Sequence, residues 1–224
     1  MGKHWARQQV RHDEVKDSVD RGIDWVRDNR QTAGTALAVV AVVGLIVGVV
    51  LRQRSSSRAA AWDRLSLAQS YAYSGRPDTA LEQLKQLDAE QGGSDAAGFG
   101  TVFAGDVLFE GGKFKEAADQ YQKLIDRGAP KSLVPVALNG LALSQESAGQ
   151  PQQAVQTAQR FLDAYGDHYL APQVHTCLAR SLQALGQAEQ AKAAWQKISL
   201  QYPDTSFAAM AQALLKGPDE KKKK

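Results

Sequence analysis

Residues 178–203, LARSLQALGQAEQAKAAWQKISLQYP, decide the fold of this chain. They contain a glycine, Gly186, whose counterparts Gly75, Gly112 and Gly149 precede it at intervals of 37 residues. An alanine stands five residues after each of these glycines, and an alanine or glycine stands seven residues before each. Four copies in constant register identify an array of one repeated unit.

Apolar residues recur at steps of three and four on both sides of each glycine, as in amphipathic helices. In the fourth unit, Leu178 and Leu182 precede Gly186, and Trp195 and Ile198 follow it. Glycine tolerates the positive φ of a sharp turn, so one helix is expected to end there before the next begins. Such a pair buries its apolar stripes only by stacking on another pair. The sequence therefore predicts an all-α solenoid.

The unit resembles the tetratricopeptide repeat, whose usual period is about 34 residues. The likeness extends over residues 60–216 and is clearest in the fourth unit, where Pro203 follows the second helix. The third unit departs from it, with Gln145 and Ala158 at usually apolar or bulky places. The segment 204–216 combines a candidate N-cap with an apolar run, which predicts a single cap helix. The resemblance therefore implies four helix pairs and a cap.

A second feature is the stretch Thr32–Leu51, which contains no charged residue and is bracketed by Arg30 and Arg52. At about 1.5 Å per residue, a helix of this length spans a hydrocarbon core about 30 Å thick. A buried core helix needs no such length of apolar residues on every side. A cleavable signal peptide has a shorter apolar stretch, and several arginines separate this one from the nearest Ala-x-Ala site. The stretch therefore predicts a single, uncleaved transmembrane helix.

These features divide the chain into five segments: a charged tail (1–31), the membrane helix (32–51), a linker (52–59), the repeat domain (60–216) and a lysine-rich tail (217–224). The N-terminal tail carries seven Lys or Arg residues, whereas a large domain crosses a membrane largely regardless of its charge. This asymmetry favours a cytoplasmic N-terminus and a repeat domain on the other side of the membrane.

Two features near the membrane helix suggest further contacts. Gly44 and Gly48 form a GxxxG spacing, which allows close helix packing and predicts a possible homodimer through the membrane helix. In the tail, Val19, Ile23 and Val26 share a helical face with Val15. That face is consistent with a helix lying on the membrane surface or docking on a partner, and a solvated tail is the alternative.

Composition argues against several functions. The formal net charge is +3, of which Lys221–Lys224 supply four positive charges, so the remainder (−1) offers no basic face for nucleic acid. The lysine run itself reads as a soluble tail, with an endoplasmic-reticulum retrieval signal as the alternative. Cys177 is expected to be a small buried hydrophobe. His175 lies only two residues from it, so the two side chains point to different sides of a helix and predict no metal site. We expect no catalytic residues, metal or cofactor. A metal-dependent enzyme is the least favoured alternative.

In proteins with similar repeats, the first helix of each pair lines a groove that binds partners. The resemblance places the following residues in that groove: Trp62, Leu65, Gln69, Tyr73, Phe99, Val102, Asp106, Phe109, Glu110, Asn139, Leu143, Glu146, Thr176, Arg180 and Gln183. The set is apolar and acidic, and Arg180 is its only basic member. It favours an extended apolar or basic segment, or a partner helix. The alternative for Phe99 and Phe109 is packing between repeats.

The layout of tail, anchor helix and repeat domain resembles the ancillary SecYEG-translocon subunit (YfgM-like) family. That resemblance implies a bacterial inner-membrane protein with a periplasmic repeat domain that binds protein partners, such as a translocon subunit, a client or a chaperone. The segment Tyr202–Thr205 also resembles repeats of envelope coordinators, so an adaptor in cell-envelope assembly, division or motility is the alternative. A mitochondrial-type import receptor facing the cytosol is a third.

Overall fold

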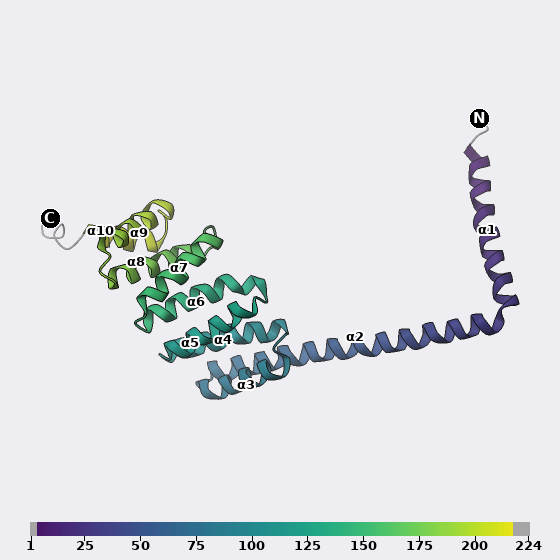
Figure 1. Cartoon of the computed structure of the whole chain (residues 1–224), viewed down its shortest axis with the longest axis horizontal. Helices are drawn as coiled ribbons and strands as arrows, with labels where there is room; N and C mark the ends of the chain where they lie inside the picture. The colour runs from purple at the N-terminus through teal and green to yellow at the C-terminus, as the bar shows by residue number, and fades with distance from the viewer. Residues whose placement is uncertain (1–3, 217–224) are drawn as a thin grey trace. The chain divides into compact units, whose positions relative to one another are not determined.

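A computed structural model describes residues 4–216, with side chains from Lys16 onward, and within this range every regular element is helical (Figure 1). The predicted lysine-rich tail, 217–224, lies outside the described residues. The helices are α1 (His4–Asp28), α2 (Arg30–Tyr73), α3 (Pro77–Gln91), α4 (Asp95–Glu110), α5 (Phe114–Arg127), the 3₁₀ turn η1 (Lys131–Leu133), α6 (Val134–Ser147), α7 (Pro151–Tyr165), α8 (Ala171–Ala184), α9 (Ala188–Gln201) and α10 (Ser206–Leu215).

The chain divides into two compact units, Met1–Ser57 and Arg58–Lys224. Helix α2 contributes to both, because it runs without interruption from Arg30 to Tyr73. The segment 52–59, which we expected to be a linker, is therefore helical. It contains neither glycine nor proline, and its three arginines, its glutamine and Ala59 are good helix formers, so nothing in it ends the helix.

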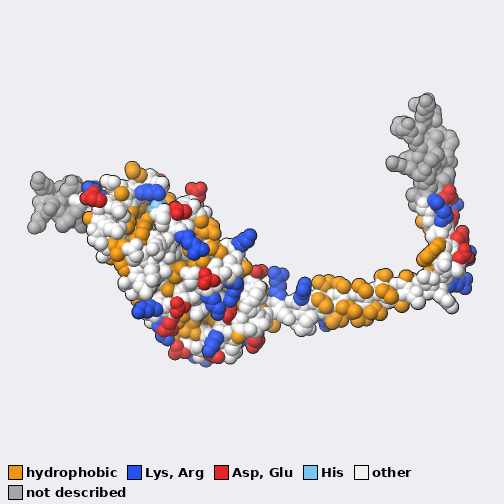
Figure 2. All heavy atoms as spheres, in the orientation of Figure 1, with side chains coloured by type: hydrophobic (Ala, Val, Ile, Leu, Met, Phe, Trp, Pro, Cys, Tyr) orange, Lys and Arg blue, Asp and Glu red, His pale blue; other side chains and the backbone are white. Residues whose placement is uncertain are grey.

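In the first unit, the apolar stretch of α2 is exposed along its length (Figure 2); Leu37 and Leu45, for example, are 72% and 70% exposed. Among the described residues, α2 is the one helix that is long and apolar enough to cross a membrane. Gly44 and Gly48 leave open space where a side chain would stand. The stretch is thus a candidate span, and the close helix packing expected of its glycines stays a prediction.

The second unit contains the four predicted helix pairs and the cap helix (Figure 1). The pairs are the C-terminal part of α2 with α3, α4 with α5, α6 with α7, and α8 with α9, and α10 follows. The positive φ predicted for the repeating glycines is confirmed, with values of 77°, 73°, 72° and 74° at Gly75, Gly112, Gly149 and Gly186. These turns set the spacing of the repeats.

The buried residues of this unit form two separate clusters. The smaller one joins the first pair to α4 and includes Ala61 and Leu65 of α2 with Leu84 and Leu87 of α3. The larger one extends from α4 to α10. Gln145, the polar residue at a usually apolar place in the third unit, has a hydrogen-bond partner. The Thr157 hydroxyl of α7 donates a hydrogen bond of 2.7 Å to Gln145 Oε1 of α6.

Helices α4, α5 and α6 pack closely around Tyr121 of α5, whose side chain is buried. A Cβ added at Gly105 of α4 would lie 2.7 Å from the Tyr121 ring, and one added at Gly140 of α6 would lie 2.5 Å from it. The aromatic ring therefore fills the space that two glycines on neighbouring helices leave. Gly105 is the one glycine in the repeating column of small residues, whose other members are alanines. A glycine is required there because the Tyr121 ring occupies the space of a Cβ.

Replacing Gly140 with alanine is expected to lower the free energy of unfolding by about 1–2 kcal/mol. In a helix, alanine is more favourable than glycine by up to about 1 kcal/mol, but overpacking costs about 1–3 kcal/mol. The Tyr121 ring cannot move away from a new methyl group at Gly140, because Gly105 lies close against its other side. Urea denaturation followed by circular dichroism measures the change. In a Tyr121→Leu background the same substitution should become neutral or stabilising. An equal loss in both backgrounds would contradict the proposed clash.

Candidate partner-binding groove

The predicted groove residues fall into an accessible group and a buried group. Trp62 and Phe99 are 38% and 41% exposed, and Tyr73 is 82% exposed. The remaining accessible or half-buried members are Gln69, Asp106, Phe109, Glu110, Leu143, Glu146, Arg180 and Gln183. These residues lie on α2, α4, α6 and α8, the first helices of the four pairs.

Four predicted groove residues are buried: Leu65, Val102, Asn139 and Thr176. Leu65 and Val102 belong to the two hydrophobic cores. Asn139 donates to Gln173 Oε1 at 3.4 Å, and the Thr176 hydroxyl donates to the Pro172 carbonyl at 2.9 Å. Their assignment to an accessible groove is corrected here. These four side chains are buried between helices or bonded within the fold, so they are not available to a partner.

Aromatic side chains gather at the first two repeats. The rings of Trp62 in α2 and Phe99 in α4 are 5.5 Å apart, and those of Tyr73 and Phe103 are 6.1 Å apart. Phe103, half-buried, was missing from the sequence-based set. Phe109 instead pairs at 5.2 Å with Phe114 of the helix that follows. The accessible aromatic surface therefore centres on Trp62 and Phe99, which we call the aromatic pair.

Asp106 and Glu110 supply negative charge on α4, and both are exposed. Tyr121 donates its hydroxyl to Asp106 Oδ1 at 2.5 Å. Desolvation and the charge of Glu110 raise the pKa of Asp106, although the hydrogen bond from Tyr121 opposes the shift. Burial and the nearby Asp106 carboxylate raise the pKa of Tyr121 as well, so the phenol remains a proton donor. Asp106 is consequently held against the core by Tyr121.

The single basic residue of the predicted set is already engaged. Arg180 of α8 makes two hydrogen bonds to Glu146 of α6, at 2.6 and 2.8 Å. That interaction raises the pKa of the Arg180 guanidinium. Burial, with Glu146 close by, also raises the pKa of Cys177, which suits an inert core thiol better than a reactive one. Because Arg180 and Glu146 neutralise each other, Asp106 and Glu110 dominate the charge of this set.

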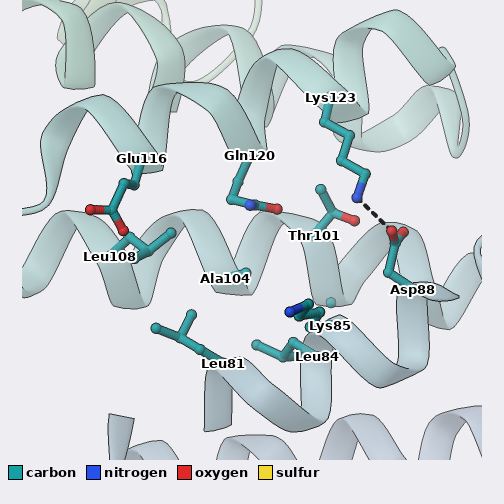
Figure 3. Close-up of a pocket in the computed structure, with 11 residues that line it drawn as sticks. Leu81, Leu84, Lys85, Asp88, Thr101, Ala104, Leu108, Glu116, Gln120 and Lys123 are labelled. Carbon is teal, nitrogen blue, oxygen red and sulfur yellow. Dashed lines mark hydrogen bonds and ion pairs between the residues drawn. The ribbon is translucent and has the colours of Figure 1, made fainter. Parts of the chain in front are cut away.

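A cavity of about 240 Å³ lies on another side of the repeats, between α3, α4 and α5 (Figure 3). Its apolar lining includes Leu81, Leu84 and Leu108. At one end, Asp88 of α3 accepts hydrogen bonds from Lys123 at 2.5 Å and Arg127 at 2.6 Å. Sequence analysis missed these pairs, although their separations of 35 and 39 residues bracket one repeat period. They bind the first repeat to the second across the cavity.

The Asp88→Asn substitution is expected to lower the free energy of unfolding by about 1 kcal/mol, because a partly exposed ion-pair network contributes little more. Burial opposes ionisation of Asp88, but the hydrogen bonds from Lys123 and Arg127 outweigh it and lower its pKa. The contribution is therefore present above the ordinary Asp pKa of 3.8 and is lost as the pH falls further. Urea denaturation at pH 7, in low and high salt, measures it. As a control, Arg58→Gln removes an exposed pair with Asp95 and should change little.

Among the described residues, no group of three or more His, Cys, Asp or Glu side chains could hold a metal ion. The accessible residues instead combine an exposed aromatic pair with the acidic side chains Asp106 and Glu110. Aromatic rings attract apolar and positively charged groups, and carboxylates attract positively charged groups.

Comparison with known proteins agrees with the arrangement of the helices in repeated pairs. The family model described as "Tetratricopeptide repeat" matches residues 104–132, 137–168 and 178–205. No curated protein matches the chain in sequence. Among solved structures, nearly identical TPR-like repeats of Podosopora anserina have a TM-score of 0.56 at 20% identity, covering 70% of this chain and 84% of that one.

Two other solved structures show the same fold. A tetratricopeptide repeat protein of Parabacteroides merdae has a TM-score of 0.59 at 16% identity, and the coverage is 70% of this chain and 59% of that one. YrrB, described as a TPR protein with an unusual peptide-binding site, has a TM-score of 0.51 at 17% identity, covering 69% and 77%. Family match, repeat register and helix arrangement together make this chain a tetratricopeptide-repeat protein, a class of scaffold for protein–protein interaction.

Proposed function

We propose that this chain is a membrane-anchored, non-enzymatic scaffold whose repeat domain binds a client or chaperone beside the inner-membrane secretion machinery. In this proposal Thr32–Leu51 is the anchor, the N-terminus is cytoplasmic and the repeats are periplasmic. The exposed apolar stretch of α2 and its arginine flanks support the anchor. The resemblance in layout to the ancillary translocon subunits supports the setting.

The aromatic pair is the observation that carries the binding proposal. Trp62 and Phe99 remain 38% and 41% exposed although each is a large apolar side chain with a partner ring only 5.5 Å away. Exposed aromatic residues of this kind are favoured at binding surfaces. YrrB, which shares the fold, is described as binding peptide. We infer that the partner contributes an extended apolar segment with Lys or Arg residues near Asp106 and Glu110.

The proximity of this surface to the anchor follows from the sequence alone. Ten residues separate Leu51 from Trp62. Even a fully extended chain covers no more than about 3.5 Å per residue, so the aromatic pair is tethered within about 40 Å of the end of the apolar stretch. Partners that reach it are therefore membrane proteins or proteins close to the membrane surface.

The binding test compares two substitutions in the full-length protein, crosslinked in membranes and purified in detergent. Trp62→Ser combined with Phe99→Ser should remove the main crosslinked partner. Tyr169→Ser alters an aromatic residue that is 76% exposed but lies outside the first helices of the pairs, and it should retain the partner. Equal crosslinking in both variants would contradict a role for the aromatic pair.

The membrane setting is tested separately. The protein should stay in membranes during alkaline carbonate extraction. Protease added to the periplasmic side of intact inner membranes should cleave the repeats. Exchange of Thr32–Leu51 for an unrelated apolar helix should release a translocon partner while membrane attachment persists. If the partner is instead retained after this exchange and is lost only when Trp62 and Phe99 are substituted, the envelope-adaptor function is favoured. Protease access from the cytosol would indicate an import receptor.

A further inference from the structure

Helix α1 carries its apolar and its charged side chains on opposite faces. At about 3.6 residues per turn, Val19, Ile23 and Val26 share one face. Every described side chain of this helix, from Lys16 to Asp28, is exposed, and the three apolar ones are 55%, 51% and 49% exposed. The opposite face holds all the charged residues of this segment: Lys16, Asp17, Asp20, Arg21, Asp24, Arg27 and Asp28.

The charges are ordered within their own face. At the helical spacing, the four aspartates lie between two borders of basic residues, with Lys16 and Arg27 along one border and Arg21 along the other. Arg21 Nη2 lies 3.5 Å from Ser18 Oγ, on the uncharged side of the helix. Long basic side chains at such borders place their methylene stems against apolar surroundings and their charged ends in water.

The apolar face of α1 lies close in sequence to the candidate membrane span. Helix α1 ends at Asp28 and α2 begins at Arg30, so the helix is interrupted at Asn29, which allows α1 and α2 to differ in direction. Val26 precedes Thr32 by six residues, and a chain covers no more than about 3.5 Å per residue, so the face begins within about 21 Å of the span. An anchor at Thr32–Leu51 therefore holds this face beside the bilayer.

We propose that α1 lies along the bilayer surface, with Val19, Ile23 and Val26 among the lipid chains just below the headgroups and the aspartates facing water. This inference rests on the proposed anchor. The basic borders then lie level with the lipid phosphates on both sides of the embedded helix, an arrangement that an apolar protein partner does not require. Trp25, on the uncharged side and 56% exposed, belongs to a residue type enriched at membrane–water interfaces.

The apolar face, rather than net charge, supplies the attraction. Lys16–Asp28 contains three basic and four acidic residues, a net charge of −1, so anionic lipid does not attract the segment as a whole. Surface binding of α1 should therefore persist in vesicles of pure phosphatidylcholine and in high salt. A contact that required anionic lipid would contradict this arrangement of the helix.

Spin labels on the full-length protein, reconstituted in phosphatidylcholine vesicles, test the contact. Cys177 is fully buried, so labelling concentrates on the introduced cysteines. A label at Ile23→Cys should be accessible to oxygen, which concentrates in lipid, and protected from a water-soluble nickel complex. Its neighbour Asp24→Cys should show the reverse, and Leu45→Cys should be the most deeply buried of the three.

Each other outcome has a distinct meaning. If Leu45→Cys is buried in lipid but Ile23→Cys and Asp24→Cys are equally exposed to nickel, α1 does not lie on the surface, although the anchor stands. If Leu45→Cys is exposed to nickel, the anchor fails and the surface helix fails with it. Protection of Ile23→Cys from both reagents would indicate a protein contact and would overturn the lipid contact.

A pair of double variants provides the second measurement, read from a label at Val26→Cys. Val19→Gln with Ile23→Gln removes most of the apolar face but keeps good helix formers, so α1 should detach from the bilayer. The ratio of detached to bound helix should rise about tenfold or more, and the nickel accessibility of the label should rise with it. Asp20→Gln with Asp24→Gln alters the opposite face and should leave the label protected. Equal accessibility in the two double variants would overturn the proposal.

Discussion

The Phe161→Ala variant is expected to lose about 3–5 kcal/mol of unfolding free energy, the range for truncating a buried aromatic residue. Phe161 of α7 is fully buried, and its ring lies 5.7 Å from the ring of Tyr165 and 5.8 Å from that of His168. Removing the ring leaves a cavity between the third and fourth pairs. Because each repeat contacts mainly its neighbours, the loss should concentrate there.

Urea denaturation followed by circular dichroism measures the loss, and Tyr169→Ala is the control. Tyr169 is also aromatic and near the same turn, but it is 76% exposed, so its truncation should change stability by less than about 0.5 kcal/mol. Phe161→Leu should fall between the two variants. A loss below about 1 kcal/mol in Phe161→Ala would show that the solenoid closes over the missing ring.

Stability is also expected to fall as the pH drops from 6.5 toward 4, because of His175. Burial, with the charge of Lys197 adding to it, lowers the pKa of His175 to about 4. Between pH 6.5 and 4, His175 is therefore protonated in the unfolded chain but remains neutral in the folded chain. The penalty grows through this window to roughly 3 kcal/mol and is absent above it.

A neutral replacement isolates this effect. In His175→Asn the decline of unfolding free energy between pH 6.5 and 4 should become shallower, whatever the variant's stability at pH 7.5. Asp88→Asn serves as the comparison, because it should lower the curve evenly above pH 5 and leave its slope unchanged. An unaltered slope in His175→Asn would exclude His175 as the source of the pH dependence.

The repeat architecture was predictable because it depends on local rules that recur four times. The spacing of Gly75, Gly112, Gly149 and Gly186 predicted the turns, and all four have positive φ. The cap helix was also predictable from its apolar run and an N-cap candidate in the segment 204–216, and the structure shows Thr205 as the N-cap residue. Periodicity sufficed because each unit repeats the same solution.

The surface was harder to predict, because a column of equivalent residues does not fix how each helix is rotated. Leu65 and Val102 appeared to line the groove, yet a small rotation directs both into the cores. The segment 52–59, assigned as a linker, lies inside α2, because its residues include none that ends a helix. The packing of Tyr121 between Gly105 and Gly140 involves three helices, α4, α5 and α6. It could not be predicted from the sequence pattern of one repeat, because Gly140 belongs to the next repeat.

The division of the core beside the α3–α5 cavity has a consequence for how the solenoid opens. The first pair joins the rest through its own small cluster, through Leu81, which packs against both clusters, through ring contacts with α4 and through the Asp88 ion pairs, while α4 to α10 share one continuous interior. Amide protons of α3 should therefore exchange with solvent before those of α6 to α8, through a subglobal fluctuation that leaves the later repeats intact. Such a fluctuation would alter the proposed binding surface at Trp62 without unfolding the protein.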